Sequence, residues 1–332
     1  MRLPLLLASF SLLSLGYLPA QHPKTLPEVF TGSYAGGGNL FPLARTRGFI
    51  QYFHRGDQFP ATRIVREMGW RLTKTTTTIA ALSHKLEIKI GNSKVTYSTL
   101  NKTFSKNFTS TPTTFLKLKT FNFPAITKVP QDPDKPNAWI KGDAPFIWLG
   151  PNLVIQVDIQ TATTFGNTTV RAIVDSMSST NPKTYNTNMS CGGTISASYT
   201  GGAFGGTVSG TLANSPVIYL LGNHLLPVDV GFIFGKGCSV TVNPLVTFMG
   251  VANASGNASF SVPFVPPTTT TLHLQALHRP KSGPGLASTN VSHILFGGNN
   301  NISTYLYNWT RDGLSAQYGP YSTNRGPVVL FR

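Results

Sequence analysis

Hydrophobic and polar residues alternate along several short segments of the chain, and this period-2 pattern is typical of half-buried β-strands. In residues 152–160, aliphatic side chains occupy every second position, and Gln156, Asp158 and Gln160 fall on the opposite face. The same alternation recurs in residues 86–90, 258–264 and 272–276, with Gly, Pro and Asn clusters between them. Several short strands at such spacing predict antiparallel β-sandwiches.

The composition agrees with an all-β fold. The 332 residues include 32 Gly and 24 Pro, and only 11% are charged. Asn, Thr, Ser and Gly dominate where a helical protein would use Ala, Glu, Lys and Leu. A porin-like barrel shares the alternation, but the Pro-rich turns and the lack of repeated ten-residue lipid-facing strands count against it. We therefore predict two antiparallel β-sandwich modules, jelly-roll or immunoglobulin-like, after a signal peptide.

The composition also changes along the chain and suggests where these modules begin and end. A Ser/Thr/Asn-rich stretch near Pro182 separates the basic first half from a Gly-rich strand region. We expect five segments: a signal peptide (1–20), a basic β-sandwich module (21–178), a linker (179–190), a second β-sandwich module with a disulfide (191–298) and a C-terminal strand segment (299–332). The last segment is expected to pair back onto one of the modules.

The first twenty residues predict export. Met1 and Arg2 form a short positive region, an apolar run follows from Leu3 to Leu18, and the small residue Ala20 precedes Gln21. The alternative is a membrane anchor, but the run is interrupted by Pro and Gly and is shorter than the roughly 20 apolar residues that a spanning helix needs. We expect a secreted or cell-surface protein with no transmembrane segment.

Two cysteines, Cys191 and Cys238, follow the predicted signal peptide. An even number of cysteines in an exported protein favours a disulfide over two separate buried thiols. Closing a loop of about 48 residues would stabilise the fold by roughly 3 to 4 kcal/mol in the chain-entropy model. Two sulfur atoms alone do not make a structural zinc site.

Short motifs in both halves resemble a group of uncharacterised exported two-module β proteins of planctomycete-type bacteria. The motifs of the first half are Asn39-Leu40-Phe41-Pro42, Ile50-Gln51-Tyr52-Phe53, Phe59-Pro60, residues 64–71 and residues 152–159. Those of the second half are Cys191-Gly192-Gly193, Gly237-Cys238-Ser239-Val240, residues 256–265, Leu274-Gln275-Ala276-Leu277 and Ser288-Thr289-Asn290. The resemblance implies a two-module exported β protein, and it supplies no catalytic residue.

Charge is unevenly distributed along the chain. The formal net charge is +16, of which residues 42–141 hold +12 and residues 142–332 only +3. Such a positive potential attracts polyanions. We expect the first module to bind acidic polysaccharide, lipopolysaccharide or extracellular nucleic acid. The alternative is a solvated surface whose charge maintains solubility and discourages edge pairing.

The candidate polyanion-binding residues are the lysines that follow one another in the middle of the basic half. Even spacing places two pairs of them, 85 with 89 and 117 with 119, on one strand face each. The seven residues are Lys85, Lys89, Lys94, Lys102, Lys106, Lys117 and Lys119.

No catalytic motif is recognisable in the chain. Asp132 and Asp134 lie in a Pro-rich turn with too few oxygen ligands for Ca²⁺, so we predict no metal site. Because no catalytic or cofactor-binding motif is present, we also predict no cofactor and no catalytic residue. The leading hypothesis is a non-enzymatic extracellular or surface-associated binding or structural protein. The alternative is a secreted hydrolase that acts on polysaccharide with distant carboxylates such as Asp158, Asp175 and Asp229.

Three aromatic residues near the end of the chain, Tyr305, Tyr307 and Trp309, share one face of a predicted strand, 303–310. Such a row offers a platform for stacking sugar rings. The alternative is that this face is buried, because Tyr and Trp cover large areas of a core.

Overall fold

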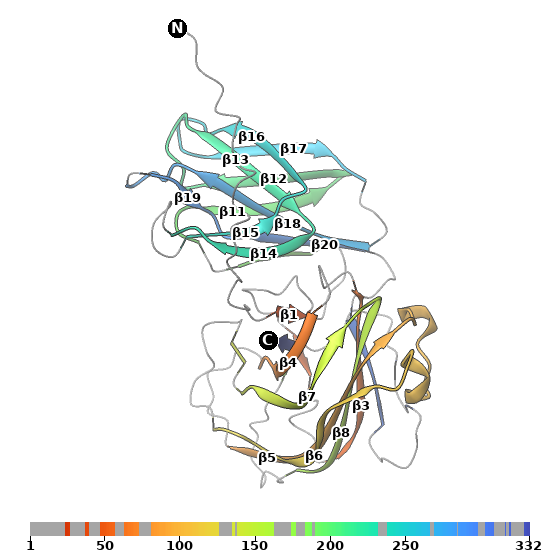
Figure 1. The fold of residues 1–332 in the computed structure, drawn as a ribbon. Helices are drawn as coiled ribbons and strands as arrows, with labels where there is room; N and C mark the ends of the chain where they lie inside the picture. Colours follow the sequence, from red (N-terminus) through yellow and green to blue (C-terminus); the bar gives the residue numbers. More distant parts are fainter. Residues whose placement is uncertain are drawn as a thin grey trace.

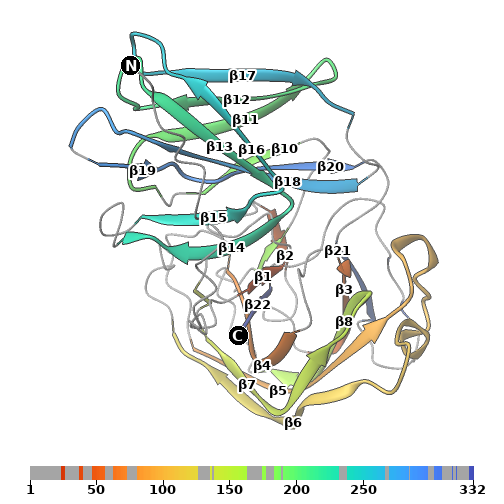
Figure 2. The ribbon, with the colours of Figure 1, turned by 45° about the horizontal axis from the view of Figure 1, so that its top comes forward.

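The structure is a computed structural model of the chain. It describes residues 24–26, 37–39, 47–56, 63–72, 81–125, 135–136, 138–162, 174–176, 183–187, 190–231, 238–265, 269–283, 285–297, 303–308, 316, 319 and 329–332. In this part of the chain the fold is all-β, with antiparallel sheets stacked face to face, as the sequence predicted. Figures 1 and 2 show the sheets in two groups.

The amino-terminal sheet group contains two larger sheets and one strand pair. Its five-stranded sheet has the order β21 (Ser303–Asn308), β3 (Gly48–His54), β8 (Asn152–Ala162), β5 (Leu82–Ser93) and β6 (Thr113–Phe123). Its four-stranded sheet has the order β1 (Lys24–Leu26), β22 (Val329–Phe331), β4 (Arg63–Trp70) and β7 (Ile140–Trp148). The strand pair consists of β2 (Gly37–Asn39) and β9 (Val174–Ser176).

The predicted alternation builds the core of this group. Ile50 on β3, Ile88 on β5 and Ile155 on β8 are fully buried and point toward the four-stranded sheet, which contributes residues such as Met68 and Phe146. Their sequence neighbours point the other way, because successive side chains of a strand alternate between its faces. We call that second surface the outer face of the five-stranded sheet.

The carboxy-terminal sheet group contains three sheets. The largest has the order β10 (Lys183–Asn186), β20 (Ser292–Gly297), β18 (Thr269–His278), β13 (Pro216–Gly222) and β16 (Val246–Val251), and β19 (Ala287–Ser288) pairs with β18. A second sheet contains β11 (Thr194–Thr200), β12 (Ala203–Ser209) and β17 (Ala258–Pro263), and the third contains β14 (His224–Asp229) and β15 (Ser239–Asn243).

A second apolar core lies between the two larger sheets of this group. Val217 and Leu274 of the largest sheet face Ile195 and Phe204 of the three-stranded sheet. A smaller apolar cluster joins the opposite face of the largest sheet to the pair β14–β15. The largest sheet of the group is therefore covered on both faces.

Two segments that were predicted to lie outside the modules form strands. The C-terminal segment pairs back as expected: β21 joins β3, and β22 lies between β1 and β4. Residues 183–186, inside the predicted linker, form the edge strand β10 beside β20. Pairing with β20 along all four residues holds this polar, linker-like sequence as a strand, and the hydroxyl of Ser292 also donates a hydrogen bond to Asn186 Oδ1 over 2.6 Å.

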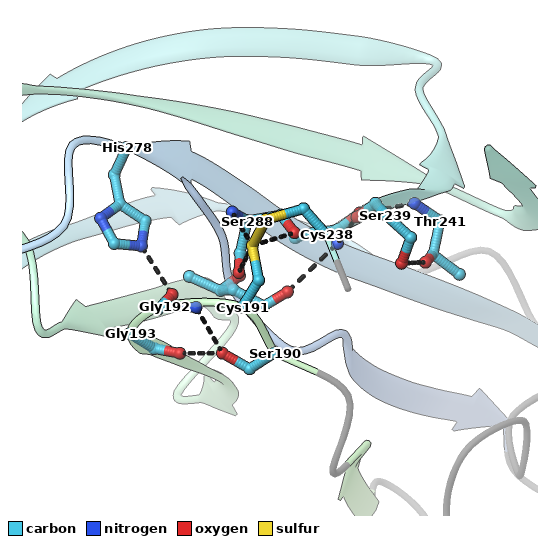
Figure 3. Close-up of a disulfide and its surroundings, with 11 residues drawn as sticks. Ser190, Cys191, Gly192, Gly193, Cys238, Ser239, Thr241, His278 and Ser288 are labelled. Atoms are coloured by element: carbon cyan, nitrogen blue, oxygen red, sulfur yellow. Dashed lines mark hydrogen bonds between the residues drawn. A yellow bond between two sulfur atoms is a disulfide. The ribbon is translucent and has the colours of Figure 1, made fainter. Parts of the chain in front are cut away.

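The two cysteines form the predicted disulfide. Their sulfur atoms lie 2.03 Å apart and their Cα atoms 5.0 Å apart, and Figure 3 shows the bond beside His278 and Ser288. The amide and hydroxyl of Ser288 both donate to the Cys191 sulfur, and a ring nitrogen of His278 lies 2.8 Å from the carbonyl oxygen of Gly192. The bond thus ties the start of the carboxy-terminal group to the segment before β15.

Within the described residues, no helix combines the length and the hydropathy needed to cross a membrane. The predicted signal peptide, residues 1–20, lies outside the part of the chain that the structure describes.

Candidate ligand-binding groove

Three polar side chains form a row across the outer face of the five-stranded sheet. Gln51 on β3 is paired with Gln156 on β8, and Gln156 is paired with Lys89 on β5. Each follows an isoleucine that points into the core, so the alternation of the strands directs this row outward. The outer face is therefore polar at the middle of the sheet.

Residues 94–112, the covering loop, lie over this row and contain the short helices η3 (Tyr97–Thr99) and η4 (Phe104–Asn107). Phe104 is buried in a small apolar cluster with Leu306 and Ala316, and its ring centroid lies 6.1 Å from that of Phe49. The amide of Ala316 also donates to the carbonyl oxygen of Lys102 over 2.7 Å. In Figures 1 and 2 the gold loop stands on the side of β3 and β8 away from β4 and β7.

A glycine fixes the far side of the covering loop. A Cβ atom added to Gly91 of β5 would lie 2.5 Å from Cδ1 of Phe108 and 3.3 Å from Cβ of Pro112. The Phe108 ring therefore rests directly on the strand backbone, and a larger residue at position 91 would displace it.

A chain of side-chain amides joins the loop to the sheet. Asn107 accepts from the amide of Asn101 (2.8 Å) and donates to that residue's carbonyl oxygen (2.7 Å) and to Gln51 Oε1 (2.9 Å). Gln51 Nε2 donates to the carbonyl oxygen of Phe104 (2.9 Å) and to Gln156 Oε1 (2.8 Å). Backbone partners, which only donate or only accept, fix the orientation of the first two amides. The Gln156 oxygen is consequently occupied, and its Nε2 is the donor that remains.

A groove of about 440 Å³ opens between the covering loop and the outer face. Ligand sites in proteins occupy about 300 to 1,000 Å³ and combine apolar walls with a few polar groups. This groove fits that description: its walls are aromatic and proline rings, its rim carries hydroxyl groups, and one lysine and one glutamine supply the remaining polar atoms. The lining residues are Phe49, Phe104, Phe108, Pro112, Ser105, Thr109, Ser110, Thr111, Lys89 and Gln156.

Four of the seven predicted lysines have no acidic partner among the described residues. Lys94, Lys102 and Lys106 are exposed on the covering loop, and Lys85 is exposed on the outer face of β5. The ion pairs seen within the described residues include none of the four. Their charges are thus available to a ligand.

The other three predicted lysines lie next to carboxylates. Lys89 Nζ is 2.9 Å from Glu87 Oε2 on the same strand face. Lys119 Nζ lies 2.6 Å from Asp143 Oδ1, and the amide of Lys117 donates to the same carboxylate. The hydrogen bond from Lys119, aided by the Lys117 amide, lowers the pKa of Asp143. The seven lysines are therefore not equivalent, and those of β6 lie at the sheet edge beside β7.

The structure describes only two of the three residues of the predicted aromatic platform. Tyr305 and Tyr307 lie on β21 with their rings stacked 5.8 Å apart, and both pack against the core of the amino-terminal group. Both rings are half-buried there, whereas Leu306 and Asn308 on the other face of β21 are buried, so the role of this face in stacking sugars stays a prediction. Trp309 lies outside the described residues.

Among the carboxylates considered for hydrolysis, Asp158 has a described side chain, and it does not line the groove. Asp158 is buried on the outer face, where it is paired across the strands with Glu87. The side chains of Asp175 and Asp229, and the turn with Asp132 and Asp134, lie outside the description. Among the described residues, no group of three or more His, Cys, Asp or Glu side chains is placed to hold a metal ion.

Sequence reasoning missed Gln51, Asn107 and the aromatic side chains that form the groove. The available signal was the outward position of Gln156 on the predicted strand 152–160; Gln51 appeared only in a short motif, and no strand was predicted there. Their partnership depends on contacts across 53 to 105 residues of sequence, which periodicity alone does not reveal.

Comparison with known proteins finds no matching family model, curated protein or solved structure for this chain. The resemblance to exported planctomycete-type proteins stays a prediction.

Proposed function

We propose that this is a non-enzymatic secreted or surface-associated protein that binds acidic polysaccharide through the covering loop. The observation that carries the proposal is the charge of this region. Between Glu87 and Asp132 the sequence contains seven lysines and no acidic residue. Three of these lysines are exposed on the covering loop, and the same loop supplies Phe104, Ser105 and residues 108–112 to the lining of the groove.

Two further features favour a polysaccharide over lipopolysaccharide or nucleic acid. The rim of the groove offers the hydroxyl groups of Ser105, Thr109, Ser110 and Thr111, which suit a ligand rich in hydroxyl groups. The groove occupies one side of a single sheet, whereas single-stranded nucleic acid is bound along successive stacking aromatics in a charged channel.

The test compares the affinity of the full-length chain for heparin over a range of salt concentrations. Binding through several lysines weakens steeply with salt because counterions are released. Replacing Lys94, Lys102 and Lys106 by Gln should reduce the slope of log K against log salt by about three.

A charge-matched control separates a site from a general positive field. The variant Lys141→Gln, Arg279→Gln, Lys281→Gln loses the same three charges from exposed positions outside the loop, and it should bind heparin almost as the native chain does. Equal losses in both variants would contradict the proposed site. Shortening of an acidic polysaccharide by the native protein would instead favour the hydrolase alternative.

A further inference from the structure

We infer that the groove is a subsite for one uronic acid residue, a pyranose ring that carries a carboxylate, within the polysaccharide. This inference rests on the proposed function and names the sugar that the same region recognises.

The base of the groove presents two hydrogen-bond donors side by side. Gln156 Nε2 donates to no protein acceptor within the described residues, since the Gln156 oxygen already accepts from Gln51. Lys89 lies directly opposite Gln156 on the neighbouring strand and lines the same groove. A cationic donor next to an amide donor complements a carboxylate, which accepts hydrogen bonds through both oxygens.

The direction of the Gln156 amide is set by the protein. Every donor of Asn107 and Gln51 is used inside the network, on backbone carbonyls or on the next amide. Turning the Gln156 amide over would place its NH₂ group against the Gln51 NH₂ group and leave buried donors unpaired, at a cost. The groove therefore offers a donor at this point before any ligand arrives.

The walls suit the ring that bears the carboxylate. Phe49, Phe104 and Phe108 provide apolar surfaces, against which the C–H face of a pyranose is removed from water. The hydroxyls at the rim both donate and accept hydrogen bonds, as the hydroxyls of a sugar do.

Glu87 provides an internal check on the charge of the ligand. Its carboxylate lies 2.9 Å from Lys89 Nζ, so it competes with an anionic ligand for that ammonium group. Replacing Glu87 by Gln removes this competition and one negative charge. A uronate should then bind about two- to fivefold more tightly, whereas a neutral sugar should not respond.

The experiment titrates the full-length chain with trigalacturonate and with its methyl ester, which keeps the rings and removes the charges. The native chain should bind the acid about tenfold or more tightly than the ester. Gln156→Glu, which replaces the donor by a carboxylate of the same shape, should weaken acid binding about tenfold or more. Asn122→Asp, with the same change of charge on the exposed edge strand β6, should leave binding nearly unchanged.

The outcomes separate this inference from the proposed function. Heparin binding that depends on the loop lysines, together with no preference for trigalacturonate over its ester, would overturn the uronate subsite alone. Tighter acid binding by Glu87→Gln, with native melting behaviour of every variant, would support it. If the native chain binds neither heparin nor trigalacturonate, the uronate subsite and the proposed function are both overturned.

Discussion

Gln156 and Gln275 occupy comparable places in the two sheet groups, each on the face of the larger sheet that points away from its main core. Gln275 is fully satisfied: its oxygen accepts from the amides of Thr241 (2.8 Å) and Val242 (3.3 Å), and its nitrogen donates to the carbonyl oxygens of Ser239 (2.9 Å) and Thr289 (3.1 Å). In Gln156, by contrast, the Nε2 donor faces the groove and donates to no protein acceptor within the described residues.

The segments that cover these two faces also differ: one closes its face completely, and the other leaves a groove. The pair β14–β15 closes the carboxy-terminal face with apolar side chains, including Leu225 and Val242. The covering loop of the amino-terminal group leaves about 440 Å³ beside a basic surface. The face that points away from the main core is thus closed in the carboxy-terminal group and is a candidate binding surface in the amino-terminal group. The segment that covers each face accounts for this difference.

The largest expected effect is a loss of stability of the amino-terminal group at low pH. Burial lowers the pKa of His54 to about 3, while the unfolded chain takes up that proton near pH 6.5. Stability should therefore fall as pH decreases from 6.5, by about 1.4 kcal/mol per pH unit and about 4 kcal/mol by pH 3.5.

Urea denaturation of the native chain and of His54→Leu at pH 6.5 and pH 5 measures this contribution. The variant should lose about 2 kcal/mol less than the native chain over this interval. Equal losses in the two proteins would show that His54 is not responsible.

The next largest effect is expected on removal of the disulfide, which belongs to the carboxy-terminal group alone. Replacing Cys191 and Cys238 by Ser should lower the free energy of unfolding of the carboxy-terminal group by about 3 to 4 kcal/mol, because the unfolded chain regains the freedom of a loop of that length. Heparin binding at low temperature should persist, since the groove belongs to the other group. Calorimetry with a parallel binding assay checks both parts, and a simultaneous loss of heparin binding would argue against separate roles.

The two glutamines give a direct comparison of smaller size. Gln275→Met leaves buried amide and carbonyl groups without partners and should cost about 2 to 3 kcal/mol. Gln156→Met removes one internal hydrogen bond beside an open groove and should cost about 1 kcal/mol or less. Chemical denaturation of both variants measures the difference, and equal costs would mean that the Gln156 amide is as fully engaged as that of Gln275.

The smallest effect is expected at Asp143. This carboxylate is exposed and joined to Lys119, and pairs of this kind contribute little to stability. Asp143→Asn should leave the melting temperature unchanged and slightly raise retention on a heparin column, because Lys119 loses its acidic partner. A clear loss of stability would show that the pair holds β6 against β7.

The sequence was sufficient for those features that depend on local pattern. The alternation of residues 152–160 predicted the inward face of β8, and the even spacing of Lys85 and Lys89 correctly placed both on one strand face. The cysteine count predicted the disulfide. These predictions succeed because strand periodicity is a property of neighbouring residues and the cysteine count is a property of composition.

The groove required information that the sequence does not contain. The Asn107, Gln51 and Gln156 amides meet only after β3 and β8 have paired and the covering loop has folded onto them. The neutralisation of Lys119 by Asp143 likewise depends on the packing of β6 beside β7. The linker-like residues 183–186 become a strand because β20 supplies a pairing edge.

Hydrogen exchange of the full-length chain with and without a heparin oligosaccharide is the most direct test of where binding occurs. We predict slower exchange in the covering loop and in neighbouring β5, and unchanged exchange in residues 238–297 of the carboxy-terminal group. The slowing should disappear at high salt, because the contacts are ionic. Protection centred on the carboxy-terminal group, with the covering loop unchanged, would contradict the account.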